Sequence, residues 1–384
     1  MPNIAKLIIS IKLISLAIFS TQVALAHSLE KESDKTDKVS ETAEKRVTLY
    51  TSYGYKQDKY WFIPLRAWIS EDMGITRSLS LKAARKAIQK KADIEELTDD
   101  QKQRFKFRAE DFLRDSESDE IIDIQFDNDV SKMVYQLVDS DGNLETDRNG
   151  NIQGTIVISE KKATQTLLAQ NSKNGWLKFN VVSDNMYGAG KVRLIPEEGL
   201  SIISDIDDTI KVTEIPSGTK TVLRNTFFKP FKAAPNMLPM YRDLSEETAF
   251  HYVSGGPWQL YTGLTDFMFE NGVNFPLGSL HMKNVRTNLT ESESYQDIIK
   301  LVEGSATVEQ KLEQISGVFS HFPKRKFILI GDSGEHDPEI FAQIKRRFPK
   351  QVKEIRIRDI VNDSKLNPNR LKGMTVISVA ETQI

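Results

Sequence analysis

The stretch Ser201-Ile202-Ile203-Ser204-Asp205-Ile206-Asp207-Asp208-Thr209-Ile210 decides the fold of this chain. Its apolar, β-branched start is typical of a buried strand, and three carboxylates follow it. If the strand continues, its period of two points Asp205, Asp207 and Thr209 towards one site. Carboxylates this close repel one another unless a cation lies among them, and Mg²⁺ is expected because it prefers oxygen ligands. The competing interpretation is an acidic turn after the strand.

Two later apolar runs also end in polar residues that suit a phosphate or a metal. Residues 250–253 precede Ser254-Gly255-Gly256-Pro257. There Ser254 can donate a hydrogen bond, and the glycines let backbone N–H groups, including that of Gly255, approach phosphate oxygens. An ordinary loop is the alternative. Residues 327–330 run into Gly331-Asp332 and then reach Asp337.

Helical patterns alternate with these strands at residues 259–269, 308–319 and 338–348. This alternation predicts an α/β fold, in which a mostly parallel sheet carries helices on both faces. Ligands of such sheets bind outside the carboxyl ends of the strands, where Asp205, Ser254 and Asp332 are expected. Three strand ends that bring oxygen ligands to one edge indicate a functional site.

The first half of the chain has the sequence pattern of a β-rich domain. Strand-like runs in residues 46–196 are separated by turn signals such as Asp141-Gly142. Helical patterns interrupt them, and Thr98 and Gln101 form a candidate capping box. A chain of 384 residues favours two domains. We expect a small β-sandwich with a helical insertion at residues 46–196 and an α/β domain at residues 197–384.

The composition argues against several classes of protein. The formal net charge of −2 gives no support for a nucleic-acid binder, which normally carries a basic excess. The absence of cysteine excludes disulfides, thiolate catalysis and cysteine-ligated zinc. The five histidines are scattered without ligand spacing, which argues against a histidine-based metal site.

Residues 1–26 have the pattern of a secretory signal peptide. Lys6 supplies the positive start, residues 7–26 are largely apolar, and Ala24-Leu25-Ala26 offers a cleavage site. An uncleaved anchor is the alternative, since the apolar stretch is long enough to span a bilayer. We expect export to the periplasm or secretion. Residues 27–45, which have almost no large apolar side chain, are expected to form a disordered linker.

The three strand ends resemble the catalytic domain of the actin-patch-associated phosphatidate phosphatases, a family of the haloacid dehalogenase superfamily. The resemblance rests on residues 205–211, with the pattern Asp-x-Asp-x-Thr, on residues 252–261 and on residues 327–338. It covers roughly residues 200–360. Residues 46–196 are similar, more weakly, to the β-rich region that precedes this domain in bacterial members. The resemblance implies a Rossmann-like haloacid dehalogenase fold for the catalytic domain.

The resemblance also implies a magnesium-dependent phosphatase that hydrolyses a phosphate monoester through an aspartyl-phosphate. Asp205 would attack phosphorus, and Asp207 would protonate the leaving alkoxide and then take a proton from water. Thr209 would orient the loop and support Asp207. Ser254 and Lys311 would hold the phosphoryl oxygens.

The position of Mg²⁺ follows from the same resemblance. Its ligands would be Asp205, the backbone carbonyl of Asp207, and Asp332, with Asp337 behind them. Much of the acceleration of phosphate ester hydrolysis must come from neutralising phosphoryl oxygens, which a bound cation helps to do.

Three lysines precede Asp332 and are candidates for binding the phosphoryl group. Lys311 is favoured because it lies 21 residues before Asp332, in a predicted helix that can lean over the strand ends. Lys324 and Lys326 follow closely on Pro323 and are expected to face water.

The expected substrate is phosphatidate, which hydrolysis would convert to diacylglycerol, and a membrane surface is an expected partner. Residues 211–250 lie where the superfamily commonly inserts a cap. They carry Phe227, Phe228 and Phe231, with Lys229 and Lys232 among them. These side chains either dock on a bilayer, as aromatic and basic residues do together, or pack onto the core of the domain.

Two other functions remain open. The phosphatase could act on a soluble phosphate ester or a phosphoprotein, since fold and chemistry do not fix the leaving group. The chain could also be an exported binding module with a vestigial phosphatase fold. A binding module has no need of Asp205, Asp207, Ser254 and Asp332 together, which argues against this alternative.

Overall fold

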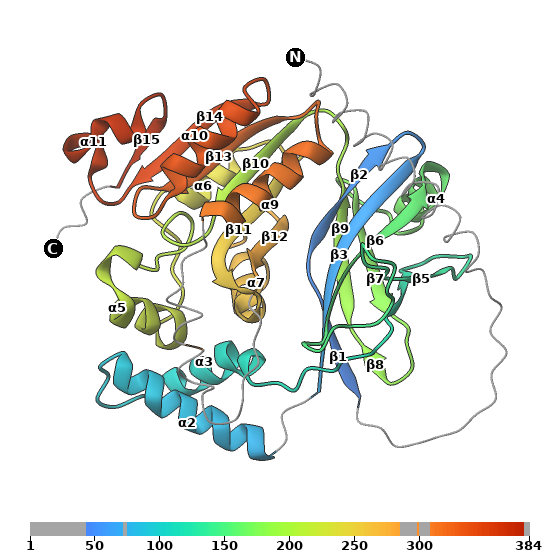
Figure 1. The fold of residues 1–384 in the computed structure, drawn as a ribbon, viewed down its shortest axis with the longest axis horizontal. Helices are drawn as coiled ribbons and strands as arrows, with labels where there is room; N and C mark the ends of the chain where they lie inside the picture. Colours follow the sequence, from blue (N-terminus) through green and yellow to red (C-terminus); the bar gives the residue numbers. More distant parts are fainter. Residues whose placement is uncertain (1–43, 72–74, 285–297, 299–307, 380–384) are drawn as a thin grey trace.

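The structure, a computed structural model, describes residues 44–71, 75–284, 298 and 308–379 (Figure 1). The predicted signal peptide and all but the last two residues of the predicted linker lie outside this range, so both stay predictions. Within the described residues, no helix has the length and apolar character that crossing a membrane requires. The chain forms a β-rich part up to residue 194 and an α/β part from residue 200 onwards.

Nine strands form the sheet of the β-rich part: β1 (Lys45–Leu49), β2 (Ser52–Gln57), β3 (Tyr60–Ser70), β4 (Asp123–Phe126), β5 (Val134–Gln136), β6 (Asn151–Ser159), β7 (Trp176–Val181), β8 (Met186–Tyr187) and β9 (Ala189–Leu194). Their order is β5-β4-β7-β9-β2-β3-β1-β8, with β6 beside β3. β2 pairs first with β9 and then with β3, so it joins two groups of strands. Both groups contribute to one buried core, for example through Ile63 and Ile124. The sheet therefore folds over one core, and the sandwich topology stays a prediction.

In the described residues of the β-rich part, the α-helices are α2 (Ile75–Lys91), α3 (Asp99–Ala109) and α4 (Glu160–Ala169). The predicted helical insertion is present as α2 and α3, which lie between β3 and β4 in the chain. The predicted capping box is confirmed, because the Thr98 side chain accepts from Gln101 N while Gln101 Oε1 accepts from Thr98 N.

Six parallel strands form the second sheet: β10 (Leu200–Asp205), β11 (Ala249–Pro257), β12 (Ser279–Lys283), β13 (Lys326–Asp332), β14 (Val352–Asp359) and β15 (Thr375–Ser378). Their order across the sheet is β12-β11-β10-β13-β14-β15. Counted along the chain, this is the 3-2-1-4-5-6 order of doubly wound sheets, which reverses between β10 and β13. Ligands of such sheets bind in the crevice at this reversal, beside the carboxyl ends of the two strands.

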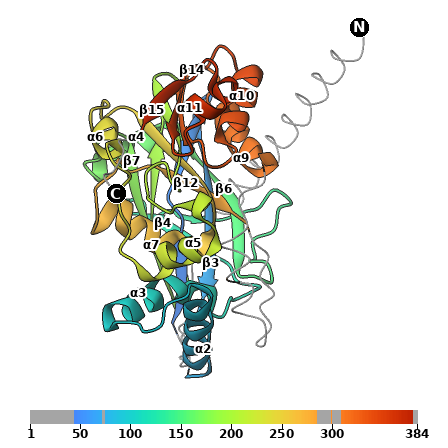
Figure 2. The ribbon, with the colours of Figure 1, turned by 90° about the vertical axis from the view of Figure 1, so that its left-hand side faces the viewer.

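Helices cover both faces of the parallel sheet (Figures 1 and 2). Among the described residues of the α/β part, the α-helices are α5 (Thr219–Leu223), α6 (Met237–Arg242), α7 (Tyr261–Thr265), α9 (Val308–His321), α10 (Asp337–Arg347) and α11 (Asp363–Leu366). Ile203 of β10 packs in one cluster with α9 and α10, and Ile202 packs in another with α6. Neighbouring side chains of a strand face opposite sides of the sheet. Because helices cover both sides, Ile202 and Ile203 are both fully buried. The α/β class with a parallel sheet is confirmed, and the haloacid dehalogenase arrangement stays a prediction.

The helical insertion packs against the segment that follows the first motif, as both views of the fold show (Figures 1 and 2). In the π-helical turn η3 (Arg224–Phe228), Phe227 and Phe228 are almost completely buried. Their ring centroids both lie 5.5 Å from that of Phe105 in α3. Of the two alternatives left open by the sequence, packing onto the core is therefore the one that holds for Phe227 and Phe228, because protein covers them. They belong to a core that η3 shares with the insertion.

Three histidines that are far apart in the sequence meet where the two parts touch. His251 of β11 and His281 of β12 have ring centroids 6.0 Å apart. Both rings contact Tyr53 of β2, with centroid distances of 5.2 and 5.9 Å. Tyr53 Oη lies 2.8 Å from His321 Nδ1, and the Tyr55 ring stacks on His321 at a centroid distance of 3.9 Å. This aromatic cluster fixes β2 against the α/β part.

We expect acid to weaken this contact. Burial lowers the pKa of His281, with a smaller effect from the His321 charge, and burial alone lowers the pKa of His321; both fall from 6.5 to about 4. A folded-state pKa below the unfolded one gives stability that is complete above pH 6.5 and is lost as the pH falls towards 4. Thermal unfolding midpoints measured across this range should fall. The double variant His281→Gln/His321→Gln should show a flatter profile, and an equally steep profile would contradict the assignment.

Candidate active site

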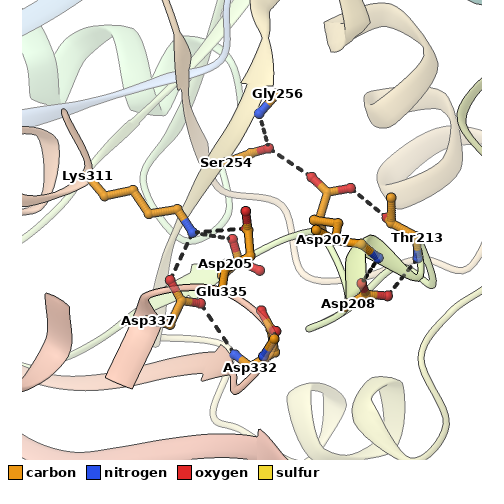
Figure 3. Close-up of polar contacts among 12 residues, drawn as sticks. Asp205, Asp207, Asp208, Thr213, Ser254, Gly256, Lys311, Asp332, Glu335 and Asp337 are labelled. Atoms are coloured by element: carbon orange, nitrogen blue, oxygen red, sulfur yellow. Dashed lines mark hydrogen bonds and ion pairs between the residues drawn. The ribbon is translucent and has the colours of Figure 1, made fainter. Parts of the chain in front are cut away.

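Acidic side chains from separate elements meet at the carboxyl edge of the parallel sheet (Figure 3). Asp205 is the last residue of β10, Asp332 is the last residue of β13, and Asp337 begins α10. One carboxylate oxygen from each lies within 4.8 Å of those of the other two. The strand order explains the cluster, because β10 and β13 are parallel neighbours whose ends coincide.

Lys311 of α9 is the cation of this cluster. Its Nζ lies 2.9 Å from Asp205 Oδ1 and 2.8 Å from Asp337 Oδ1. A third carboxylate, that of Glu335, lies 3.9 Å away. Only 3% of the Lys311 surface is exposed, so the ion pairs are shielded from water. Glu335 was not predicted, although it stands in the acidic stretch that follows β13.

The other two candidate lysines lie away from the carboxylates. Lys324 is exposed and its Nζ pairs with Glu197 at 3.2 Å. Lys326 is exposed and its Nζ donates to Lys350 O at 2.7 Å. Of the three lysines, Lys311 is the one that contacts Asp205.

Burial decides the protonation preferences of the cluster. It raises the pKa of Asp205 well above the usual range; the Lys311 charge opposes this rise, and Asp337 reinforces it. Burial opposes the charge of Lys311, but the charges of Asp205 and Asp337 outweigh it and raise the pKa above 10.5. Burial also raises the pKa of Glu335 to about 7. One lysine thus faces more acidic groups than it can neutralise, which favours a further cation.

The carboxylates retain free oxygen atoms that fit a hard divalent cation. Asp205 Oδ2 and Asp332 Oδ2 are buried and have no hydrogen-bond partner among the described residues. Asp332 Oδ1 accepts from Gly334 N at 2.6 Å, and Asp337 Oδ2 accepts from Asp332 N at 3.3 Å. Buried oxygens without a partner are costly unless something binds them, and Mg²⁺ prefers such ligands. The free oxygens of Asp205 and Asp332 therefore fit the predicted metal, and the full ligand set stays a prediction.

Asp207 lies beside this cluster in its own hydrogen-bond network. Its Oδ1 accepts from Thr213 Oγ1 at 2.6 Å and pairs with Lys211 Nζ at 2.7 Å. Its Oδ2 accepts from Ser254 Oγ at 3.1 Å. Burial would raise the pKa of Asp207, but the Lys211 charge and these hydrogen bonds outweigh burial and lower it. Lys211 and Thr213 were not predicted as site residues, although Lys211 closes the first motif.

The loop geometry differs from a continued strand. β10 ends at Asp205, and Asp208 adopts a left-handed backbone with φ of 55°. The Asp208 carboxylate accepts from three backbone N–H groups, those of residues 213, 214 and 215, at 2.7 to 2.8 Å. The expected alternation therefore fails after Asp207. Thr209 is buried, and its hydroxyl has no hydrogen-bond partner among the described residues, so Thr213 supports Asp207 in its place.

Ser254 links the second motif to Asp207. Its Oγ accepts from Gly256 N at 2.9 Å while donating to Asp207. The pairing of β11 with β12 shifts register between Val253 and Pro257, so this stretch leaves regular strand geometry. Gly255 lies half-buried in the same irregular stretch, where its backbone N–H was predicted to meet phosphate.

Gly331 is required by the close approach of Asp337. A Cβ atom at Gly331 would lie 2.3 Å from Asp337 Oδ2 and 2.7 Å from its Cβ. Gly331→Ala should therefore push Asp337 away from Lys311 and lower kcat by about 100-fold, as misplacements near 1 Å do. Gly317→Ala in α9 is the matched control, because its Cβ would meet nothing within 4 Å. The steady-state rate of phosphate release by each variant tests this prediction. A wild-type rate for Gly331→Ala would contradict it.

Known proteins resemble this chain over part of its length. Residues 200–359 match the family model described as the catalytic domain of phosphatidate phosphatase APP1. Phosphatidate phosphatase APP1 of Saccharomyces cerevisiae is 33% identical over 164 residues, which is 42% of this chain and 26% of that protein. An uncharacterized protein of Schizosaccharomyces pombe is 27% identical over 247 residues, covering 61% of this chain and 37% of the relative.

These relatives extend well beyond the matched region, because the chain spans 26% and 37% of their lengths. A solved structure of a carbohydrate esterase covers 81% of this chain and 87% of its own, but its 9% identity and TM-score of 0.18 are too low to indicate a shared fold. The matched residues 200–359 contain Asp205, Asp207, Ser254, Lys311 and Asp332. The resemblance to the phosphatidate phosphatase catalytic family, a family of phosphoric monoester hydrolases, is thus confirmed for this part of the chain.

Proposed function

We propose that this chain is a magnesium-dependent phosphatidate phosphatase, which converts phosphatidate to diacylglycerol and phosphate. The observation that carries the proposal is a buried lysine among buried carboxylates with free oxygens, at one edge of the sheet. Phosphoryl transfer needs positive charge around the phosphoryl oxygens and a nucleophile in line; Lys311 together with a bound cation would supply the first, and Asp205 would supply the second. The family match of residues 200–359 supports phosphatidate as the substrate.

Asp205, Asp332 and the backbone carbonyl of Asp207 would hold Mg²⁺, with Asp337 behind them. When bound, the ion neutralises charge on the phosphoryl oxygens. The free oxygens of Asp205 and Asp332 support this assignment. Asp337 already accepts from Lys311 and from Asp332 N, which suits a residue that orients the others.

The chain's own residues would perform two chemical steps. Asp205 would attack phosphorus and form an aspartyl-phosphate as the bond to the leaving oxygen breaks, while Asp207 gives that oxygen a proton. Water would then attack phosphorus, Asp207 would take its proton, and phosphate would leave. Lys311 and Ser254, with the backbone N–H of Gly255, would hold the phosphoryl oxygens. The Lys211 charge and the hydrogen bonds that Asp207 accepts favour its ionised form, which the second step requires.

A substrate panel tests the proposal against its alternatives. Phosphate release should be measured from phosphatidate in mixed micelles, from a sugar phosphate and from a phosphopeptide, with Mg²⁺ present. The proposal expects the highest kcat/KM for phosphatidate. A higher value for the sugar phosphate or the phosphopeptide would favour the soluble-substrate alternative. Release from none of the three would favour the binding module.

Export and contact with a lipid surface belong to the same proposal. The pattern of residues 1–26 supports export to the periplasm or secretion. A phosphatidate substrate itself requires access to lipid. The burial of Phe227 and Phe228 removes these two side chains from any such contact surface.

A further inference from the structure

Arg108 of the helical insertion is a buried cation with an unusual set of partners. Its Nη1 donates to Thr226 O and to Lys229 O, both at 2.8 Å. Its guanidinium carbon lies 3.4 Å from the centroid of the Phe231 ring. Gly263 of α7 leaves room for this arrangement, because a Cβ there would lie 3.3 Å from Arg108 Cγ. Through Arg108, the β-rich part thus makes buried contacts with residues 226–231 of the α/β part.

The same Phe231 ring lies beside the network of Asp207. Lys211 Nζ is 5.0 Å from the ring centroid and 2.7 Å from Asp207 Oδ1. The backbone reinforces this proximity, because Lys211 and Ala233 form an antiparallel bridge and Val212 N donates to Lys232 O at 2.9 Å. Lys211 is 3% exposed, so water has little access to its ammonium group. Contacts therefore run without a break from Arg108 through Phe231 and Lys211 to Asp207.

We infer that Arg108 is a positioning residue for Asp207, so that the helical insertion of the β-rich part sets the geometry of proton transfer in the α/β part. The inference rests on the proposed function, in which Asp207 transfers the proton. Phe231 covers Lys211 and keeps its Nζ on Asp207. Arg108 holds Phe231 in place through its ring and through the two carbonyls that precede it. Without Arg108, residues 226–231 lose both hydrogen bonds and the cation–π contact, and the Phe231 ring, left with its contact to Phe267 at a centroid distance of 5.6 Å, covers Lys211 less securely.

Leaving-group dependence separates this role from mere support of the fold. Phenyl phosphate releases a more basic phenolate than 4-nitrophenyl phosphate does, so it depends more on a well-placed acid. Arg108→Ala should lower kcat about tenfold or more on phenyl phosphate, and less than about threefold on 4-nitrophenyl phosphate. An unfolded fraction of enzyme would lower both rates by the same factor. Equal losses on the two esters would therefore overturn the inference.

Arg104 provides a matched control on the same helix. Its Nη1 donates to Phe228 O at 2.6 Å, so it also holds a carbonyl of η3, but its described contact is not with Phe231. Arg104→Ala should leave the ratio of the two rates as in the wild type. A ratio that changes as much as in Arg108→Ala would show that any loosening of η3 has this effect, and would overturn the specific role of Arg108.

A double-mutant cycle tests whether the contacts act in series. Lys211→Met should change the ratio of the rates on the two esters in the same direction as Arg108→Ala. The double variant should lose no more activity on phenyl phosphate than Lys211→Met alone. If the double variant instead loses activity by the product of the two single losses, the two residues act independently, and the inference that Arg108 acts through Lys211 would be overturned. If Arg108→Ala shows no cooperative unfolding transition, it does not fold, and Phe231→Leu is measured instead. The same change in the ratio of the rates on the two esters is then expected for Phe231→Leu. A wild-type chain inactive on both esters and on phosphatidate would refute the proposed function itself.

Discussion

The Asp205→Asn variant is expected to lose turnover by about 10⁴-fold or more while it keeps its fold. The amide has nearly the shape of the carboxylate but cannot attack phosphorus, so no aspartyl-phosphate forms. The fold should persist because Lys311 retains Asp337 and Glu335 as partners. Phosphate release from phosphatidate in mixed micelles measures the loss, and urea unfolding of the same preparation checks the fold.

Asp207→Asn separates the nucleophile from the acid–base residue. It should be nearly as damaging on phosphatidate, whose alkoxide needs a proton, and least damaging on esters with good leaving groups. Asp205→Asn should be equally inactive on every ester, because every ester requires the attack. An Asp205→Asn enzyme that retains most of its activity would refute the assignment of the nucleophile.

The Lys311→Met variant is expected to lose about 3–5 kcal/mol of unfolding free energy in the presence of a chelator. The change removes the charge that Asp205 and Asp337 share and leaves these buried carboxylates without a cation. Because the pKa of Lys311 is raised above 10.5, its contribution is complete at neutral pH and is lost only as the pH rises through that raised value. Urea unfolding at neutral pH therefore measures the whole effect, and activity should fall by about 10² to 10³.

Added Mg²⁺ makes this variant a test of the metal site as well. A cation bound among the same carboxylates should stabilise Lys311→Met more than the wild type, because the variant has lost the competing charge. Lys324→Met is the matched control, since Lys324 is exposed and pairs with Glu197. It should match the wild type with and without Mg²⁺. A Lys311→Met variant as stable as the wild type in chelator would contradict the assigned role of Lys311.

The parts of the site that the sequence predicts are those set by strand ends and by one helix. Asp205 and Asp332 follow apolar runs, and parallel neighbouring strands bring such ends together. The prediction of Lys311 rests on the family resemblance, on its distance from Asp332 and on its place in a predicted helix, which the structure describes as α9. The loop after Asp205 could not be predicted by periodicity, because the left-handed Asp208 turns the chain and brings Thr213 to Asp207.

Contacts between distant segments account for the remaining differences. Phe227 and Phe228 look like membrane residues in isolation, but the α3 residues that cover them lie more than 100 positions earlier, as the Arg104 and Arg108 contacts show. Likewise, His251 and His321 show no spacing that predicts their meeting with Tyr53 of β2. Local sequence patterns indicate which side chains tend to be buried, and the tertiary structure decides which residues bury them.

Acid quenching during turnover of phosphatidate with a radioactive phosphoryl group tests the central claim most directly. The account predicts label on the peptide that contains Asp205, released by hydroxylamine as expected for an acyl phosphate, and no label on Asp205→Asn. Release of phosphate from phosphatidate without labelled protein at any quench time would contradict the aspartyl-phosphate mechanism, as would equal labelling of Asp205→Asn.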